Sequence, residues 1–585
     1  MRNRRSPAVC LLLLGGSLSV CPPSARAQWL RDGVALCTAP QDQSVIQCVT
    51  DGAHGAFVYF ASPSGPDAEP LAQRVDGDGV IPEGWPACGI ALSATFGSSL
   101  VGCAVADGAG GAILAWTDRR AFNKTYVQRV TSSGVIAAGW PADPAPVVAS
   151  SGSQSNGHLA TDGASGAIVA WETGQDDVYA VRLTSAGSIA PGWPSNGRRV
   201  SLPGSGMSVS LCEDGSGGAF VAWSDRRDAS TSGADMYCQR LASDGSIASG
   251  WPVGGIPLCV APGWQGWGGF PNPITVSDGL GGALVLWPDP RDRTSGYDLY
   301  LDRVDPAGGT APGWTTNGVP VCVSPGLPQS LGDGAALCPD GTGGAFVAWS
   351  DGRLGATHVY AQHVGSDGDI RPGWPDNGLL VCGQRSLIPA LVSDGTGGAI
   401  VAWLDDRGEP GFSLQIYATR LAAEGLDPGW PTDGLAICTA GSSDAPSIAA
   451  DGTGGAIIAW SNRPAGDFNV YAQHVTGSGV VVDASVSRSA PVAALDVRAP
   501  APNPTTAGAT IRFSLPRAEV VSVEVLTVSG RRVRQLARAM PLGTGVHALT
   551  WDGRDERGNR VGAGVYFVHW TDGRAAETRK VVLRR

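Results

Sequence analysis

The stretch Asp340–Arg353, "DGTGGAFVAWSDGR", decides the fold because the chain repeats it. Asp-Gly, with Gly at the fifth position and Ala at the sixth, begins at Asp51, Asp107, Asp162, Asp214, Asp278, Asp340, Asp394 and Asp451. The tenth residue of a copy is Phe60 in the first and Trp in the seven others. Eight copies at a period of roughly 57 residues predict an array of similar structural units.

Two further signatures complete each repeat. The first is a "VYAQHV"-like segment, with Leu71 in the first copy and then Tyr126, Tyr179, Tyr237, Tyr300, Tyr360, Tyr417 and Tyr471. The second is "GWP..G...C", centred on Trp85, Trp140, Trp193, Trp251, Trp314, Trp374 and Trp430, with Trp29 as its first member. Each repeat starts at this second signature, so repeats one to eight fill residues 28–482.

Each repeat is expected to hold four strands, because no segment has a sustained helical period with caps. In repeat eight they are "GLAIC", "SIAADG", "GGAIIAW" and "VYAQHV". Asp-Gly and Gly-Gly pairs supply the positive-φ positions of a tight hairpin between the second and third strands. Four short antiparallel strands repeated eight times predict an all-β fold, an eight-bladed β-propeller resembling secreted bacterial propellers. An open β-solenoid is the alternative.

Residues present in every repeat are expected to build the scaffold. Fifteen of the 19 Trp lie at the two repeated positions, where they would pack one unit on the next. Asp-x-Arg follows the strand Trp at Asp118/Arg120, Asp225/Arg227, Asp289/Arg291, Asp351/Arg353 and Asp405/Arg407. We interpret these pairs as local ion pairs, and an arginine cluster for acidic sugars, as in sialidases, is the alternative; the sialidase Ser-x-Asp-x-Gly-x-x-Trp spacing is missing.

The N-terminus has the pattern of an export signal. Arg2, Arg4 and Arg5 precede a short apolar run, and "SARA" ends in a small-x-small site, which predicts a signal peptide over residues 1–27. A lipoprotein signal at Cys21 is the alternative. No later stretch is apolar enough for a transmembrane helix, and the net charge of −11 argues against nucleic acid as a partner. We expect a secreted or surface-attached protein.

The ionisable residues do not spell out a catalytic or metal site. No GxSxG, HExxH, P-loop or zinc-type Cys/His spacing occurs, so no enzyme activity, metal or cofactor is predicted. His363 and His474 stand where other repeats have Arg and are expected at the surface. Eleven cysteines follow the cleavage site, and disulfides Cys37–Cys48, Cys88–Cys103 and Cys322–Cys338 would join strands one and two of a repeat. A small buried slot filled by Cys, Ser or Val is the alternative.

Beyond Val482 the repeat stops. Residues 483–500 are a Pro/Ala-rich linker, and residues 501–585 alternate as six strands of a small β-sandwich. "APNP", "VSGRRV" and "WDGRDERGNRVGAGVYFV", with a closing "TRKVVLRR", resemble the C-terminal sorting domain of type IX secretion and equally the immunoglobulin-like domain of flagellar hook-capping (FlgD-like) proteins. The resemblance implies an immunoglobulin-like fold that contacts export machinery, with Trp551, Gly553, Gly558, Gly564 and Tyr566 in turns and core. Thr505 and Ala563 depart from the family pattern.

Departures from the repeat predict where a ligand binds. Repeat five inserts "APGWQGWGGFPNP" between its first two strands, and repeats four and five have long loops between strands three and four. Loops of these kinds leave a meander at the same face, so the three segments should meet and bring together Arg226, Arg227, Trp264, Trp267, Phe270, Arg291, Arg293 and Tyr297. Aromatic faces beside guanidinium groups suit a glycan or an acidic polymer.

The resulting functional hypothesis is a non-catalytic binding or adhesion protein. An extracellular polysaccharide hydrolase or lyase is one alternative, because propellers also host such chemistry. A purely structural surface protein is the other.

Overall fold

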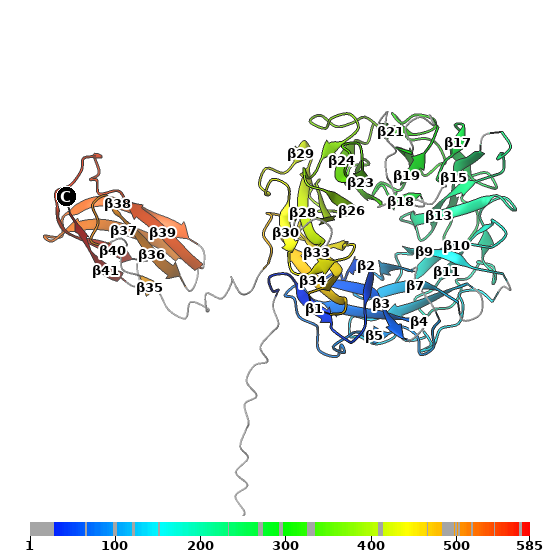
Figure 1. The fold of residues 1–585 in the computed structure, drawn as a ribbon, viewed down its shortest axis with the longest axis horizontal. Coiled ribbons are helices and arrows are strands. Elements are labelled where there is room, and N and C mark those ends of the chain that lie inside the picture. Colours follow the sequence, from blue (N-terminus) through cyan, green and yellow to red (C-terminus); the bar gives the residue numbers. More distant parts are fainter. Residues whose placement is uncertain are drawn as a thin grey trace, which may run out of the picture. The chain divides into compact units, whose positions relative to one another are not determined.

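A computed structural model describes two compact units, Met1–Asp483 and Ala484–Arg585, and each is all-β with no helix among the described residues (Figure 1). Described residues are 29–64, 67–97, 102–119, 123–149, 152–231, 233–266, 273–291, 297–323, 334–407, 413–464, 466–482, 496–497, 500, 503–515, 519–542, 545–571 and 576–584. The predicted signal peptide, residues 1–27, lies outside them. Nowhere in these ranges is there a helix long and apolar enough to cross a bilayer.

The N-terminal unit consists of small sheets, eight of them within the described ranges. The first four sheets contain β2 (Ser44–Thr50), β3 (Ala56–Ser64), β4 (Asp67–Val75) and β5 (Ile90–Ala91); β6 (Gly102–Ala106), β7 (Ala112–Asp118) and β8 (Lys124–Val130); β9 (Ser155–Thr161), β10 (Ala167–Glu172), β11 (Val178–Leu183) and β12 (Arg198–Arg199); and β13 (Gly206–Glu213), β14 (Ala219–Asp225), β15 (Gly233–Leu241), β16 (Ile256–Cys259) and β17 (Gly263–Trp264).

The other four sheets continue this order along the chain. They contain β18 (Ile274–Ser277), β19 (Ala283–Asp289), β20 (Asp298–Val304) and β21 (Val319–Cys322); β22 (Ala335–Pro339), β23 (Ala345–Asp351), β24 (His358–Val364) and β25 (Leu379–Leu380); β26 (Ser386–Ser393), β27 (Ala399–Asp405), β28 (Gln415–Ala422), β29 (Gly425–Leu426) and β30 (Leu435–Cys438); and β31 (Ser442–Ser443), β32 (Ser447–Ala450), β33 (Ala456–Arg463) and β34 (Asn469–Val475), joined by β1 (Val34–Cys37).

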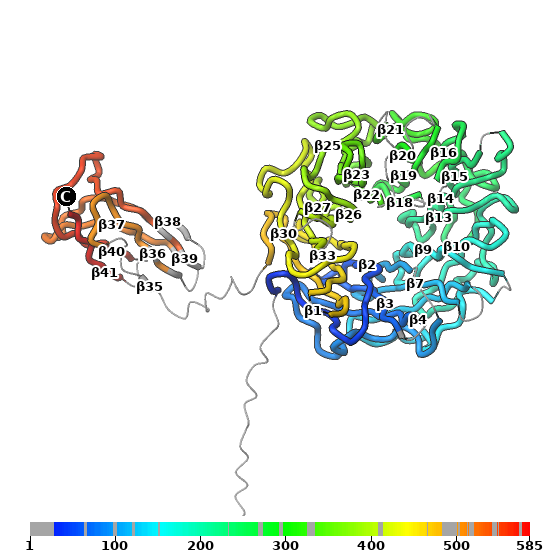
Figure 2. Tube along the Cα trace, in the orientation of Figure 1, coloured from blue at the N-terminus to red at the C-terminus, as the bar shows by residue number. Residues whose placement is uncertain are grey.

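The first strand of a repeat does not join the sheet formed by the rest of that repeat. It pairs with the fourth strand of the preceding repeat, as β16 of repeat five does with β15 of repeat four. By the same rule β1 pairs antiparallel with β34 of repeat eight, with Val34 opposite Ala472. In Figure 2 the blue segment at β1 lies beside the yellow-orange end of the N-terminal unit. The expected grouping of four strands within one repeat is therefore wrong by one strand, because the outer edge of each sheet is supplied by the chain on its way to the next sheet.

The strands at the inner edges of the sheets contact one another in chain order. β2 contacts β6, and the contacts continue through β9, β13, β18, β22 and β26 to β32, which in turn contacts β2. Their side chains line a cavity of about 500 Å³ that includes Cys48, Ala104, Leu159, Leu211 and Ile448. In Figure 1 the sheets are arranged around a common centre, and β2, β9, β13, β18 and β26 lie on the side that faces it.

The repeated Asp-Gly closes the hairpin between the second and third strands. In repeat one Asp51 Oδ1 accepts the N–H groups of Ala53 (2.7 Å) and Gly55 (2.8 Å), while Gly52 has φ +71°. A methyl group on Gly55 would lie 2.4 Å from the Val75 carbonyl oxygen, so only glycine fits. The second carboxylate oxygen meets a cation from the fourth strand: Asp51–Arg74, Asp107–Arg129, Asp162–Arg182, Asp214–Arg240, Asp278–Arg303, Asp340–His363, Asp394–Arg420 and Asp451–His474.

His363 and His474 were expected at the surface, and the expectation is wrong for His363, which is buried and stacked on Phe346 at 4.1 Å. His474 is half-buried. Each replaces the arginine that neutralises the turn aspartate, so each is drawn inward by the same carboxylate. Burial alone would raise the pKa of Asp340, but hydrogen bonds from His363, Thr342 and Gly344 outweigh it and lower that pKa to about 2.

Both repeated tryptophan positions are buried, as the scaffold interpretation expects. Trp116 and its counterparts in later repeats lie inside their sheets with at most 1% of their surface exposed. The other tryptophan joins neighbouring sheets: Trp85, between β4 and β5, donates Nε1–H to the carbonyl oxygen of Ser132, after β8, at 3.0 Å. Burying rings of this size at every junction supplies most of the apolar contact between sheets.

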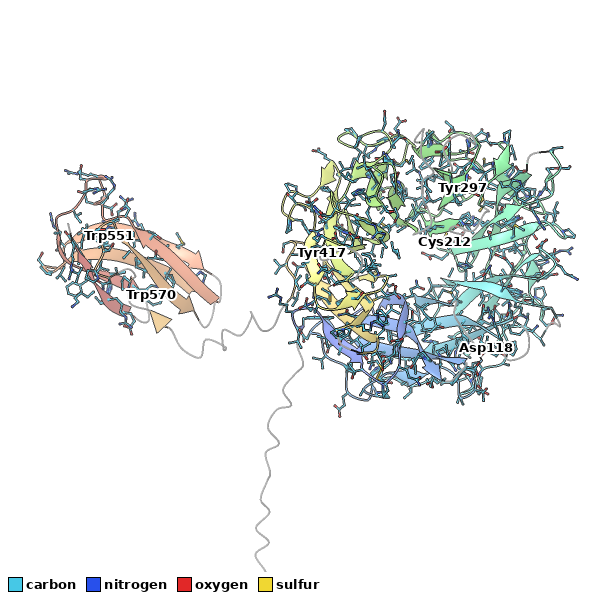
Figure 3. All side chains as sticks on the ribbon, viewed as in Figure 1. Asp118, Cys212, Tyr297, Tyr417, Trp551 and Trp570 are labelled. Carbon is cyan, nitrogen blue, oxygen red and sulfur yellow. A yellow bond between two sulfur atoms is a disulfide. The ribbon has the colours of Figure 1, made fainter. Side chains whose placement is uncertain are left out.

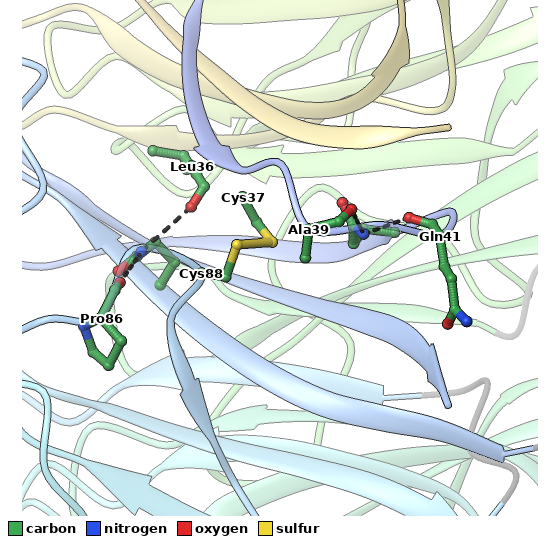
Figure 4. Close-up of a disulfide and its surroundings, with 8 residues drawn as sticks. Leu36, Cys37, Ala39, Gln41, Pro86 and Cys88 are labelled. Carbon is green, nitrogen blue, oxygen red and sulfur yellow. Dashed lines mark hydrogen bonds between the residues drawn. A yellow bond between two sulfur atoms is a disulfide. The ribbon is translucent and has the colours of Figure 1, made fainter. Parts of the chain in front are cut away.

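The cysteine pairing differs from the predicted one. Cys37 on β1 is bonded to Cys88, which precedes β5 (Figure 4). Cys48, Cys103, Cys322 and Cys338 are free thiols, so none of the three predicted disulfides forms. Because β1 belongs to the sheet of repeat eight, its cysteine faces repeat two and not its own second strand. Cys259, Cys322, Cys382 and Cys438 are buried and free, as the slot alternative requires.

The C-terminal unit is a sandwich of two sheets. One contains β35 (Asp496–Val497), β36 (Ala509–Leu515) and β39 (Gly545–Trp551); the other contains β37 (Glu519–Thr527), β38 (Arg532–Leu542), β40 (Gly564–Thr571) and β41 (Ala576–Leu583). All six predicted strands are present, and β35 adds a short one inside the predicted linker. Trp551 and Trp570, labelled in Figure 3, are fully buried between the sheets. Gly553 and Gly558 occupy positive-φ turn positions, as expected.

Candidate ligand-binding site

The insertion of repeat five lies on the face where repeats four and five meet. Its residues Gly263 and Trp264 form β17, which pairs in parallel with Gly233 and Ala234 at the start of β15. The segment then bonds both neighbours: Gln265 N–H donates to the Ala234 carbonyl at 2.8 Å, and Gly266 N–H donates to the Pro288 carbonyl at 3.0 Å. The described part of the insertion therefore lies against the end of the repeat-four loop, and the meeting of all three segments stays a prediction.

Two glycines permit this close approach. A methyl group on Gly233, whose φ is +98°, would lie 2.0 Å from the Gly263 carbonyl oxygen. One on Gly263 would lie 3.3 Å from Pro290 Cγ and 3.6 Å from the Arg291 Cα atom. The chain of repeat five is therefore inserted between β15 and the Pro290–Arg291 turn, and Trp264 remains half-buried beside them.

Two of the predicted arginines, Arg227 and Arg291, are held within the scaffold. Arg227 forms a bidentate pair with Asp225 (2.9 and 2.7 Å), donates to the Gly254 carbonyl and lies 3.7 Å above the Tyr237 ring. Arg291 makes the same contacts with Asp289, the Asn317 carbonyl and the Tyr300 ring.

The same arrangement recurs with Asp351/Arg353 and Asp405/Arg407. In all four repeats the aspartate also accepts the Nε1–H of the strand tryptophan, as Asp225 does from Trp223 at 2.7 Å. The ion-pair interpretation of Asp-x-Arg is confirmed in these repeats, and Arg120 of the fifth pair lies outside the described residues.

The remaining predicted residues are placed separately. Arg226 forms an ion pair with Asp176 of repeat three and is about one-third exposed. Tyr297, labelled in Figure 3, is half-buried just before β20 and packs against the core of repeats five and six. Trp267, Phe270 and Arg293 lie outside the described residues. Among the described arginines, Arg226 keeps the most access to solvent, and Trp264 is half-buried.

The ionisable groups of the core are mostly locked in one state. Burial, and then the nearby Asp289 carboxylate, raises the pKa of the Cys259 thiol to about 12, and burial raises that of Cys382 to about 12. Thiols of this kind stay protonated and are poor nucleophiles at neutral pH. Burial lowers the pKa of His158 to about 4. Within the described ranges no group of three His, Cys, Asp or Glu side chains is placed to hold a metal ion.

Sequence reasoning missed one site. A pocket of about 460 Å³ lies in repeat three over Trp171 and Tyr179, with Asp177 and Asn196 in its wall. The sequence does contain a signal for this pocket. Repeat three reads "WETGQDDVY" and lacks the Asp-x-Arg that follows the strand tryptophan in repeats two and four to seven.

The fold and the site define a two-part all-β protein with a repeated N-terminal unit, and a family comparison identifies the smaller part. The model of the FlgD Ig-like domain matches residues 503–574, which confirms the immunoglobulin-like interpretation of the C-terminal unit. A search of curated proteins gave no significant match.

Several solved structures align with much of the chain at low similarity. They include a protein of unknown function from Dyadobacter fermentans (12% identity, 77% of this chain and 96% of that one, TM-score 0.34) and a puromycin-hydrolyzing peptidase of Mycobacterium tuberculosis (14%, 84% and 62%, 0.35). PorZ, a surface component of the type IX secretion system of Porphyromonas gingivalis, aligns at 10% identity over 95% of this chain and 100% of that one, with a TM-score of 0.18. TM-scores this low carry no argument about fold or function.

Proposed function

We propose that residues 28–482 form an eight-bladed β-propeller that binds a ligand at its rim without catalysis. Two observations support the propeller: the inner strands contact one another from β2 round to β32 and back, and β1 completes the sheet of repeat eight. A strand that joins the first repeat to the last is the usual means of closing such a ring. Each sheet is then one blade.

The observation that carries the binding role is the insertion of repeat five. It adds β17 to a sheet that is already complete, and it holds Trp264 half-buried on the face shared by two long loops. A tryptophan held on a rigid strand loses little conformational entropy on binding, which favours ring-stacking ligands. Arg226 lies on the loop that ends at Gly233 and Ala234, the residues that pair with β17, and the ligand proposed is a glycan or an acidic polymer.

The C-terminal unit is proposed as the export address. A signal peptide over residues 1–27, a linker over 483–500 and a sorting-type domain over 501–585 would deliver the propeller to the cell surface or the medium. The match of residues 503–574 to the FlgD Ig-like domain supports the fold on which this role rests. Export machinery is the expected partner of this domain.

A glycan array tests the binding role directly. The purified chain should bind a defined set of glycans, and Trp264→Ala should abolish that binding while shifting Tm by less than about 2 °C, because Trp264 lies outside the fully buried core. Leu354→Ala is the control: Leu354 is 60% exposed in the loop between the third and fourth strands of repeat six, and its loss should leave binding unchanged.

A broad glycosidase and lyase screen on the same preparation distinguishes the alternatives. Turnover of any bound polysaccharide would replace the binding role with a hydrolase or lyase. Neither binding nor turnover would favour a purely structural surface protein.

Removing the C-terminal unit tests the export role. A chain ending at residue 482 should fold, since its core clusters contain only residues of the N-terminal unit, but it should stay inside the cell envelope. Normal surface delivery of the shortened chain would contradict the sorting role without touching the binding role.

A further inference from the structure

The pocket of repeat three is best understood by comparison with the same place in repeats four to seven. There the strand tryptophan and a tyrosine face each other across paired strands, and an arginine lies on the tyrosine ring. The guanidinium carbon is 3.7 Å from the ring centre at Tyr237, 3.6 Å at Tyr300, 4.1 Å at Tyr360 and 3.7 Å at Tyr417. We call this set of contacts the arginine cradle.

Each cradle satisfies the guanidinium group in the same way. A carboxylate two residues before the arginine takes one edge, and a backbone carbonyl from the start of the next repeat takes the other: Gly254, Asn317, Asn377 or Asp433. The tyrosine covers one face. The cradle therefore recognises a planar cation by shape, charge and hydrogen bonds together.

Repeat three keeps the cradle and lacks the arginine. Trp171 is paired with Tyr179 in the same register, and their ring centres are 6.0 Å apart with nearly parallel planes, as in repeats four to seven. Asn196 stands at the position of Asn317 and Asn377. However, the positions of aspartate and arginine hold Thr173 and Gln175, in a short turn closed by the Thr173 N–H bond to the Asp177 carbonyl at 2.9 Å. The pocket of about 460 Å³ occupies the vacated space.

The wall of this pocket supplies a carboxylate from a different position. Asp177 is 8% exposed and lines the pocket; its Oδ1 accepts the Gly204 N–H at 2.8 Å, and its Oδ2 has no partner among the described residues. The neighbouring acids are already engaged, since Asp176 pairs with Arg226 and Glu172 accepts the Val209 and Asn156 N–H groups. Trp171 Nε1 and the Tyr179 hydroxyl also lack partners in the described part of the chain.

We propose that this pocket binds a guanidinium group supplied from outside the chain, as the arginine side chain of a partner polypeptide. The planar group lies on the Tyr179 ring, one edge donates to Asp177, and the other donates to the Asn196 carbonyl. Arginine fits better than lysine because a planar fork can reach both acceptors while its face stays on the ring. This site is on repeat three and stands independently of the rim site at Trp264.

Binding of a blocked arginine tests the proposal on the full-length protein. N-acetyl-arginine amide should bind with a Kd of about 1 mM, and the isosteric neutral citrulline derivative should bind at least about tenfold more weakly. Asp177→Asn keeps the acceptor for Gly204 N–H but removes the charge, and should weaken the arginine derivative at least about tenfold. Equal binding of the two derivatives, or no effect of Asp177→Asn, would overturn the proposal.

Repeat six provides the positive control. Arg353→Ala empties its cradle while Asp351, Tyr360 and the Asn377 carbonyl remain. Ethylguanidine should then raise the Tm of Arg353→Ala by more than it raises that of the wild type, because the variant has a second empty cradle. If the two rises are equal, the cradle does not hold a free guanidinium group, and the proposal for repeat three fails with it. If Arg353→Ala does not fold, Tyr179→Leu supplies the second test: it removes the ring face of the repeat-three pocket and must lose arginine binding.

Discussion

The two units of the chain use charged side chains differently. In the N-terminal unit the ion pairs that recur from repeat to repeat are recessed: the side chain of Asp351 is 0% exposed and that of Arg353 is 19% exposed. In the C-terminal unit the ion pairs face solvent, with Arg579 and Glu577 at 37% and 42%. The first kind is repeated from blade to blade of the proposed propeller, and the second is not. The ion pairs that recur in the repeated unit are therefore part of its scaffold, whereas an exposed pair on the sandwich contributes little to stability.

This difference changes how arginines are judged as ligand-binding residues. An arginine that is bidentate to a buried carboxylate and stacked on a tyrosine, as Arg227 is, has few donors left for a ligand. The number of arginines in the repeated unit therefore overstates how many can bind an acidic ligand. Repeat three, which lacks this arginine, is the better candidate for a binding site.

The largest effect is expected from removing one recessed arginine. Arg407→Ala leaves the fully buried Asp405 without its cation and should lower the free energy of unfolding by about 4 kcal/mol, measured by denaturant unfolding at pH 7. Burial alone would raise the pKa of Asp405, but hydrogen bonds from Arg407 and Trp403 outweigh it and lower that pKa. A lowered carboxyl pKa stabilises the fold above the unfolded value, so the deficit of the variant should shrink below about pH 4. A loss under 1 kcal/mol would place this pair with the exposed ones.

Replacing a buried aspartate that has no ion pair in the described part of the chain should raise the free energy of unfolding instead of lowering it. Burial raises the pKa of Asp302 to about 7, and its Oδ2 has no hydrogen-bond partner in the described part of the chain. Its folded pKa exceeds its unfolded value of about 4, so the stability it permits at low pH is lost as the pH rises from about 4 through 7. Gln362, at the same position in repeat six, donates to the Pro375 carbonyl at 2.8 Å. Asp302→Gln should therefore add about 3 kcal/mol at pH 8 and nothing at pH 4. Equal gains at both values would exclude titration as the cause.

The smallest effect is expected on the sandwich. Arg579→Ala removes a pair in which both side chains are over a third exposed, and should change the free energy of unfolding by less than about 0.5 kcal/mol. Unfolding of the isolated C-terminal unit, followed by the fluorescence of buried Trp551 and Trp570, measures this change. A loss comparable to that of Arg407→Ala would remove the contrast between the units.

Much of the N-terminal unit could be predicted because its repeated motifs are explained by interactions between residues that are close in sequence. Asp-Gly with a later glycine encodes a hairpin whose carboxylate and positive-φ residues lie within five positions, as at Asp51. The meeting of the repeat-five insertion with the loop of repeat four also followed from the alternation of loops between two faces. The two tryptophan positions were predictable since nothing but packing explains a large ring in every repeat.

The sequence could not show whether the first strand of a repeat joins the sheet of its own repeat or that of the preceding one, and two errors followed. A strand such as "GLAIC" can pair with the strand after it or with the strand before it, and its own sequence is the same in both cases. The wrong choice also assigned Cys37 to Cys48, when the bond is to Cys88. The pocket of repeat three was missed for another reason. The search for a binding site considered inserted residues, whereas this pocket exists because an arginine is missing between Trp171 and Tyr179.

The pairing of β1 with β34 affects the order in which the chain can fold during its synthesis. Val34 leaves the ribosome more than 430 residues before Ala472, its hydrogen-bonding partner, is made. Until then the sheet of repeat eight does not exist, and the first strand has an unpaired edge that must avoid other chains. Contacts of such long range are slow to form, because the loop must close before they stabilise anything. The first strand therefore stays unpaired while repeats one to seven are made, and a truncation inside repeat eight would leave β1 without its partner strand.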